Sequence, residues 1–204
     1  MFRKLLASEF ASHGELSEEQ LGHLDQHYRL LTLWNKKINL TRIQSLEDVV
    51  RFHYCESLFL AKKLPLGTLS LVDVGSGAGF PGIPVAILRP ECRVHLLESH
   101  QRKAVFLREV SRGLSNVQAL RLRAEDCTQT FDWMIARAVR MADLISLSLA
   151  PRSAFLLGEE DACSLPSGYR IITTPWGNHR VLALTDVPRE TVPRETCMDD
   201  RTGA

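Results

Sequence analysis

Residues 72–82, with the sequence VDVGSGAGFPG, constrain the fold of this chain more than any other segment. They follow a short apolar run at 71–74 and lead into residues 81–88, where prolines fall in the first turn of a helix-like segment. A short apolar run closed by glycines is typical of a buried parallel strand. We therefore expect a strand, a glycine-rich loop and a helix, the arrangement that binds nucleotides in α/β folds.

The segments after this loop alternate between strand-like and helix-like patterns. Helices are expected at 100–113 and 141–149, and further strands at 93–98, 117–122, 131–136, 154–157, 169–173 and 180–185. This alternation predicts an α/β fold with a Rossmann-like, doubly wound, seven-stranded and mostly parallel sheet. The sheet should end in two strands without a helix between them.

The first 66 residues are predicted to form an N-terminal helical extension. Ser17 and Gln20 have the spacing of a capping box, and apolar residues then recur at helical spacing. Ser45 and Asp48 indicate a second helix start, and that helix should end near a turn at 65–67.

The chain of 204 residues is long enough for one α/β domain with a modest extension. We assign residues 1–66 to the helical extension, 67–187 to the core and 188–204 to a tail. A five-residue repeat at 187–191 and 192–196 is too short for a solenoid unit. We expect the tail to be a mobile chain end.

The charge and cysteine content exclude several classes of function. A net charge of +1 gives no overall attraction for a polyanion, although basic residues outnumber acidic ones between Arg89 and Arg123. That excess could face an anionic substrate or simply be the solvated face of helices. The five cysteines are widely spaced without a C-x-x-C pair, which argues against disulfides or a metal site and favours the cytoplasm. No apolar run reaches the length of about 18 residues that a membrane span needs.

The glycine-rich loop is compatible with two cofactors. Gly77, Gly79 and Gly82 satisfy the dinucleotide pattern G-x-G-x-x-G, which is weak evidence alone. Counting from Gly75 instead gives a tighter G-x-G-x-G, and Asp73 would repel a pyrophosphate but attract the ammonium and sulfonium of S-adenosylmethionine. These features favour S-adenosylmethionine. The remaining alternative is that the glycines only form a turn.

Two further charged residues, one acidic and one basic, lie at strand ends. Glu98 ends the second strand, where a carboxylate can accept hydrogen bonds from the ribose hydroxyls of either cofactor. The fourth strand leads into Arg137, and neither an Asp/Asn-Pro-Pro-aromatic run nor a Pro-Cys pair is present. The acceptor is then a ring nitrogen such as guanine N7, or an oxygen helped by a side chain. Arg137 could contact guanine O6 and N7, or it could pair with Glu98 or Glu125.

These motifs together resemble the RsmG family, also called GidB, of small-subunit ribosomal RNA guanine-N7 methyltransferases. The resemblance covers nearly all of residues 20–185, and its most specific marks are W-N-x-x-x-N-L-T at 34–41 and F-P-G-I-P at 80–84. The other marks are His53 with Glu56-Ser57-Leu58, Glu98-Ser99, Arg102-Lys103, Phe106-Leu107, Asn116-Val117, Arg123-Ala-Glu125, Phe131-Asp132 and Arg137-Ala138.

The resemblance implies a class I S-adenosylmethionine methyltransferase that modifies N7 of one guanine in 16S ribosomal RNA. Its substrate would be the small ribosomal subunit or a late assembly intermediate. Arg137 would lie near the methyl group as the catalytic candidate, and the candidate RNA contacts are Asn35, His53, Arg102 and Lys103. The expected cofactor-binding residues are Asp73, Gly75, Gly77, Gly79, Phe80, Glu98, Ala124, Glu125 and Arg137.

The chain departs from the family pattern at three positions. Phe52 stands where the family usually has arginine, Glu56 where it usually has aspartate, and Leu157 where it often has lysine. These departures concern the substrate side rather than the cofactor loop. Two other functions remain open, namely a noncatalytic RNA-binding or assembly factor on the same fold and a nicotinamide-dependent oxidoreductase.

Overall fold

The computed structural model describes residues 1–42, 45–177 and 179–185, so the predicted tail and its repeat lie outside the described residues. Within the described part, strands form a single seven-stranded sheet. The strands are β1 (Ser70–Val74), β2 (Arg93–Leu97), β3 (Val117–Leu120), β4 (Trp133–Arg137), β5 (Arg152–Gly158), β6 (Tyr169–Thr173) and β7 (Arg180–Thr185).

Helices precede the sheet and alternate with its first strands. Before β1 come α1 (Phe2–Phe10), the 3-10 turn η1 (Ala11–His13), α2 (Glu18–Ile38), α3 (Leu46–Asp48), the π-helical η2 (Val49–Cys55) and α4 (Glu56–Lys63). Between strands come α5 (Gly82–Leu88), α6 (Gln101–Val110), the 3-10 turn η3 (Ala124–Asp126), α7 (Met141–Ile145) and α8 (Glu159–Ala162).

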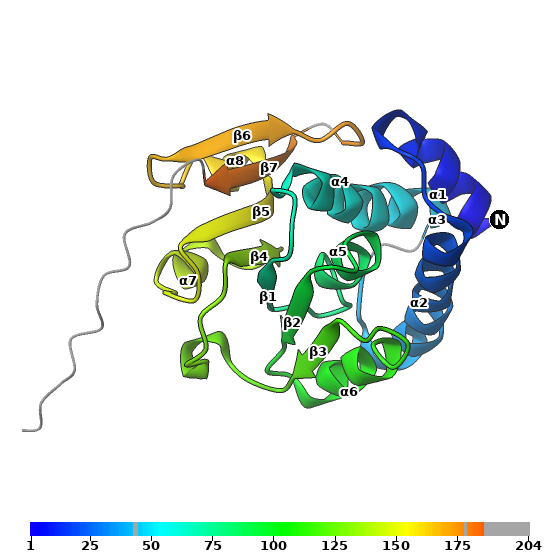
Figure 1. Ribbon diagram of the computed structural model, residues 1–204, viewed down its shortest axis with the longest axis horizontal. Coiled ribbons are helices and arrows are strands. Elements are labelled where there is room, and N and C mark those ends of the chain that lie inside the picture. The colour runs from blue at the N-terminus through cyan, green and yellow to red at the C-terminus, as the bar shows by residue number, and fades with distance from the viewer. Residues whose placement is uncertain (43–44, 178, 186–204) are drawn as a thin grey trace, which may run out of the picture.

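The order of the strands across the sheet is β3-β2-β1-β4-β5-β7-β6 (Figure 1). All pairs from β3 to β5 are parallel, whereas β7 is antiparallel to both β5 and β6. The prediction of a mostly parallel, seven-stranded sheet ending in two strands without a helix between them is confirmed. The chain leaves β1 toward β2 on one side and later returns to β4 on the other, so the order reverses at β1. Ligands of open α/β sheets bind at such a reversal, beyond the carboxyl ends of the strands.

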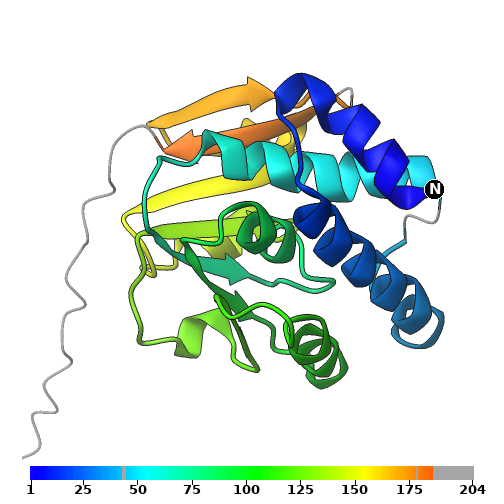
Figure 2. The same cartoon turned by 45° about the vertical axis from the view of Figure 1, so that its right-hand side comes forward.

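Each face of the sheet carries its own apolar cluster. Successive side chains of a strand point to opposite faces, and Leu71 accordingly belongs to one cluster while Val72 and Val74 belong to the other. The first cluster includes buried side chains of α1, α2, α4, α5 and α6, which lie on the same side of the sheet (Figure 1, Figure 2). The N-terminal helices are therefore packed into the main core.

The predicted helix starts of the N-terminal region are confirmed. Ser17 and Gln20 form a reciprocal capping box at the start of α2, and the Ser45 hydroxyl accepts a hydrogen bond from the Asp48 N–H. The second start leads through a π-helical turn, η2, before α4. None of the described helices is long and apolar enough to cross a membrane.

One local prediction was wrong, and one short helix was not predicted. The helix expected at 141–149 ends at Ile145, and beyond it the Leu149 carbonyl accepts a hydrogen bond of 2.8 Å from the Phe131 N–H. A one-turn helix, α8, follows β5 without having been expected, and three acidic residues occupy its first turn, where negative charge is favourable.

Candidate functional site

The glycine-rich loop after β1 has a backbone that only glycine adopts easily. Gly75, Gly77 and Gly79 have φ angles of 68°, 54° and 87°, in the left-handed region that side chains disfavour. At Gly75 an added Cβ would also lie 2.9 Å from Cγ2 of Val139. The loop therefore brings bare backbone to the carboxyl end of β1, next to the segment that follows β4.

Asp73 lies behind this loop. Its side chain is fully buried, and Oδ2 accepts a hydrogen bond of 2.9 Å from the Gly82 N–H at the start of α5. Oδ1 has no hydrogen-bond partner among the described residues. Burial raises the pKa of Asp73 to about 7, against the opposing effect of its hydrogen bonds. The acid thus holds the loop to the helix, and a direct contact between Asp73 and a ligand stays a prediction.

Glu98 binds the loop from the neighbouring strand. One carboxylate oxygen accepts from the Gly77 N–H at 3.1 Å, and the other accepts from the His100 N–H at 2.7 Å. A carboxylate oxygen can accept more than one hydrogen bond. Glu98 can therefore hold the loop and still receive hydroxyl donors from a ligand.

A cavity of about 160 Å³ lies beside these residues, beyond the carboxyl ends of β1, β2 and β3. It brings together four of the predicted cofactor residues, Gly75, Glu98, Ala124 and Glu125. Its remaining lining comes from Val74, Leu97, Ser99, Leu122, Arg123, Val139, Asp143 and Leu147. We refer to it below as the loop cavity.

Phe80 does not line the loop cavity. Its ring stacks on that of His53 at 4.7 Å and meets the rings of Tyr54 and His27 edge-on. His27 also bonds to the Ala78 carbonyl at 3.0 Å. The far side of the loop, including Gly79, is thus anchored in the N-terminal helices.

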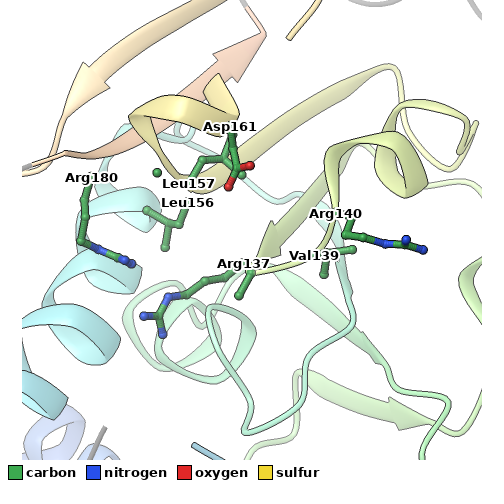
Figure 3. Close-up of a pocket in the computed structure, with 9 residues that line it drawn as sticks. Arg137, Val139, Arg140, Leu156, Leu157, Asp161 and Arg180 are labelled. Carbon is green, nitrogen blue, oxygen red and sulfur yellow. The ribbon is translucent and has the colours of Figure 1, made fainter. Parts of the chain in front are cut away.

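A second cavity of about 310 Å³ lies beyond the ends of β4 and β5. It is lined by Arg137, Ala138, Val139, Arg140, Leu156, Leu157, Gly158, Asp161 and Arg180. Figure 3 shows that Arg137 and Arg180 reach toward the same region beside α4, whereas Arg140 points away. We call this the arginine cavity.

A buried carboxylate joins the two arginines. Glu56 is fully buried, and Arg180 donates to both of its oxygens, with Nη2 at 2.6 Å from Oε2. Arg137 Nε lies 3.8 Å from Oε2, within the distance of an ion pair. Burial lowers the pKa of Arg137 to about 10, so the guanidinium stays charged at neutral pH. Among the described residues, Arg137 is thus paired with Glu56 and not with Glu98 or Glu125.

His53 contacts both parts of the site. Its ring stacks on Phe80 of the loop, its Nδ1 is hydrogen-bonded to Nη1 of Arg137, and its Nε2 lies 2.8 Å from Oγ1 of Thr41. Burial, followed by the nearby charge of Arg137, holds the pKa of His53 well below its usual value. The imidazole is therefore neutral near pH 7.

The two cavities share one wall. The side chain of Val139 lines both of them. The two cavities are therefore adjacent at this residue.

The predicted RNA contacts are distributed over different elements. His53 lies at the centre of the site, but the side-chain amide of Asn35 is bonded to the backbone of Thr41. Arg102 and Lys103 lie at the start of α6, after β2, with Arg102 exposed and Lys103 half-buried. No group of three or more metal-ligating side chains occurs in the described ranges.

Sequence reasoning missed Arg180 and the central role of Glu56. Glu56 is one helical turn after His53, a spacing that places both on one face. The sequence therefore allowed the prediction that Glu56 lies beside His53. Arg180 is 124 residues away from Glu56 and carried no local motif. Its guanidinium also lies 5.6 Å above the ring of Phe52, one of the positions that depart from the family pattern.

The model of one protein family matches this chain. Its description is "rRNA small subunit methyltransferase G", and the match covers residues 20–154.

Relatives with the name ribosomal RNA small subunit methyltransferase G match at substantial identity. The protein from Rhodospirillum centenum is 42% identical over 79% of this chain and 74% of its own length. That from Pelotomaculum thermopropionicum is 44% identical over 61% of this chain and 56% of its own length. The chain spans about three fifths of the length of several such relatives.

Solved structures share the fold at low sequence identity. A predicted O-methyltransferase from Agrobacterium tumefaciens superposes with a TM-score of 0.54 at 16% identity, covering 63% of this chain and 79% of that protein. A precorrin-6y C5,15-methyltransferase from Geobacter metallireducens gives a TM-score of 0.51 at 15% identity, covering 71% and 90%. These similarities show a Rossmann-like methyltransferase fold.

Proposed function

Because this chain belongs to the GidB family of small-subunit ribosomal RNA methyltransferases, we propose that it methylates N7 of one guanine in 16S ribosomal RNA. The methyl donor in this proposal is S-adenosylmethionine. The RNA substrate is the small subunit or a late assembly intermediate. The observation that carries the proposal is the shared wall at Val139, which places a nucleotide-type cavity directly beside an arginine-lined one.

The loop cavity suits S-adenosylmethionine. Gly75 presents backbone without a side chain, and the Glu98 carboxylate faces the cavity with capacity for ribose hydroxyls. Ala124 and Glu125 would lie against the adenine, and Asp73 adds a buried acid that a cationic ligand would help to ionise. When bound, the cofactor would supply an electrophilic methyl group on a sulfonium.

The arginine cavity suits the acceptor guanine. N7 of guanine carries a lone pair at neutral pH, so its methylation requires alignment and exclusion of water more than a strong base. A guanidinium can donate to guanine O6 or stack on the ring, and either contact leaves the N7 lone pair free for the methyl group. We assign to Arg137 the task of orienting the base, because its side chain lines this cavity next to Val139.

The neighbouring side chains hold Arg137 in place for that task. Glu56 balances part of the charge of Arg137 and Arg180, and His53 accepts a hydrogen bond from Arg137. Arginine has five N–H donors, so these contacts leave donors for the base. Arg102 and Lys103 at the start of α6, a few residues after Glu98 and Ser99 of the loop cavity, would contact RNA phosphates.

The cellular setting of the proposal is the cytoplasm. The four described cysteines, Cys55, Cys92, Cys127 and Cys163, are all free thiols, as is usual in a reducing compartment. A substrate in the small ribosomal subunit agrees with this setting.

The proposal is tested by mapping N7-methylguanine in 16S ribosomal RNA from cells with and without the gene. We expect one site to lose the modification on deletion and to regain it with the wild-type gene but not with Arg137→Ala. A noncatalytic assembly factor would leave the modification pattern unchanged, and calorimetry would show no binding of S-adenosylmethionine. An oxidoreductase would instead change the absorbance of reduced nicotinamide.

A further inference from the structure

A chain of hydrogen bonds connects the N-terminal helical region to Arg137. It begins at Asn35 on α2, whose side-chain Nδ2 donates to the Thr41 carbonyl at 3.0 Å and whose Oδ1 accepts from the Thr41 N–H at 2.8 Å. Both ends of the amide are therefore used to hold the backbone of one residue. The segment between Asn35 and Thr41 turns at Asn39, which has a φ of 48° and ends α2.

The chain continues from Thr41 to His53. The Thr41 hydroxyl oxygen lies 2.8 Å from Nε2 of His53, and Nδ1 of the same ring faces Nη1 of Arg137. A guanidinium nitrogen can only donate, so Nδ1 must be the accepting nitrogen. A neutral imidazole that accepts at Nδ1 carries its proton at Nε2. Nε2–H therefore donates to the Thr41 hydroxyl.

The other tautomer would face two N–H groups toward each other at Arg137. A doubly protonated ring would produce the same clash of two N–H groups at Arg137. Burial and the charge of Arg137 also oppose this protonation, because they lower the pKa of His53. The guanidinium of Arg137 thus fixes the tautomer, and the Thr41 hydroxyl accepts from Nε2–H and holds the ring in the orientation that accepts from Arg137. Asn35 fixes that hydroxyl by fixing the backbone of Thr41.

We propose that Asn35 and Thr41 are positioning residues for methyl transfer, which hold the His53 ring through its Nε2–H and thereby fix the orientation of Arg137. The inference rests on the proposed function, in which Arg137 orients the acceptor guanine. It gives Asn35 a role through Thr41 in place of the RNA contact expected from the sequence. It also makes the N-terminal helices a working part of the arginine cavity.

The direct test replaces Thr41 by valine, which has nearly the same shape without the hydroxyl. In protein with ¹⁵N-labelled histidine, the wild-type His53 should show a protonated Nε2 and a non-protonated Nδ1, with the signals assigned by their loss in His53→Gln. Thr41→Val should shift both nitrogen resonances. Turnover of small subunits from cells lacking the gene should fall about tenfold at unchanged KM for the subunits.

Two further variants serve as rescue and control. Thr41→Ser keeps a hydroxyl and should restore both the nitrogen resonances and the turnover. Thr32→Val removes another threonine hydroxyl of the same helical region, which donates to the Tyr28 carbonyl at 2.9 Å outside the chain of contacts. This control should change neither reading.

Unchanged His53 resonances in Thr41→Val would overturn the inference, and so would a raised KM with unchanged turnover, which would make these residues RNA contacts. If Thr41→Val does not fold, Asn35→Asp provides the same reading, since it keeps the acceptor for the Thr41 N–H and removes the donor to its carbonyl. If the wild type transfers no methyl group, the proposed function is refuted. The inference about His53 is still tested, because its nitrogen resonances are measured without substrate.

Discussion

The two cavities are built in different ways although they share a wall. The loop cavity is formed by the ends of β1, β2 and β3 and by the segment that follows β4, and its key carboxylate binds backbone N–H groups nearby. The arginine cavity depends on side chains from the N-terminal helices, β4 and β7, which are held together by one buried ion cluster. The first is a property of local backbone, and the second is a property of distant side chains.

This difference leads to different expectations for mutation. A backbone-built cavity should lose ligand affinity gradually when one side chain is removed. A cavity built on a buried carboxylate shared by two guanidiniums should lose folding stability as well as turnover, because the remaining charges stay buried without a partner.

The largest effect is expected for Glu56→Ala. Removal of this buried carboxylate leaves Arg137 and Arg180 without their counterion, and loss of one partner of a buried ion pair costs about 3–5 kcal/mol of unfolding free energy. Urea denaturation measures the loss. The control is Glu159→Ala, which breaks an exposed contact with His179 and should change stability by less than about 0.5 kcal/mol. Equal losses in both variants would remove the distinction between the two regions.

Asp73→Asn should change the pH dependence of folding stability, because it removes the buried acid behind the glycine-rich loop. The folded-state pKa of Asp73 is raised to about 7 from 3.8, so its contribution to stability is full below pH 3.8 and is lost as the pH rises through 7. Asparagine does not titrate. Relative to the wild type, the variant should therefore gain up to about 4 kcal/mol between pH 4 and pH 8.

Denaturation of both proteins at several pH values tests this expectation. His27, whose pKa burial lowers to about 4, titrates in the opposite direction below pH 6.5, but it is present in both proteins and cancels in the difference. A difference that is constant with pH would show that Asp73 is not held protonated by burial.

Arg137→Ala should separate turnover from cofactor affinity. The side chain lines the arginine cavity and not the loop cavity, so we expect turnover to fall about 100-fold, as for loss of one positioned donor. Calorimetric affinity for S-adenosylmethionine should stay within about twofold of the wild type. Parallel losses in both would assign Arg137 to the cofactor site or to folding.

Glu98→Ala should give the smallest effect. In contrast to Arg137→Ala, it should lower cofactor affinity and leave turnover unchanged. It removes a carboxylate that holds the Gly77 N–H and lines the loop cavity, so affinity for S-adenosylmethionine should fall about tenfold. Turnover at saturating cofactor should stay near the wild-type value. Unchanged affinity would show that Glu98 serves only the loop backbone.

The fold could be predicted well because its signals are local. The apolar run of β1, the glycines at 75–79 and the alternation of later segments all lie within short windows, and they led to the correct sheet. The end of α7 was missed, and the segment beyond it is tied to the start of the next region of the sheet by a hydrogen bond from the Phe131 N–H to the Leu149 carbonyl. No periodicity within the helix records such a tertiary contact.

One part of the candidate site follows from the same local signals. Gly75, Glu98, Ala124 and Glu125 come from strand ends and meet in one cavity as such topology requires. Arg180 could not be found, since its partnership with Glu56 exists only after β7 has inserted beside β5. The amide of Asn35 looked available for RNA in the sequence, and only the fold shows that Thr41 occupies it.

The most direct test of the division between the cavities is tritium transfer from methyl-labelled S-adenosylmethionine to unmodified small subunits, with cofactor concentration varied for Glu98→Ala and Arg137→Ala. We predict that high cofactor restores labelling of guanine N7 by Glu98→Ala but not by Arg137→Ala. Restoration of both variants, or of neither, would contradict separate sites for the methyl donor and the acceptor base.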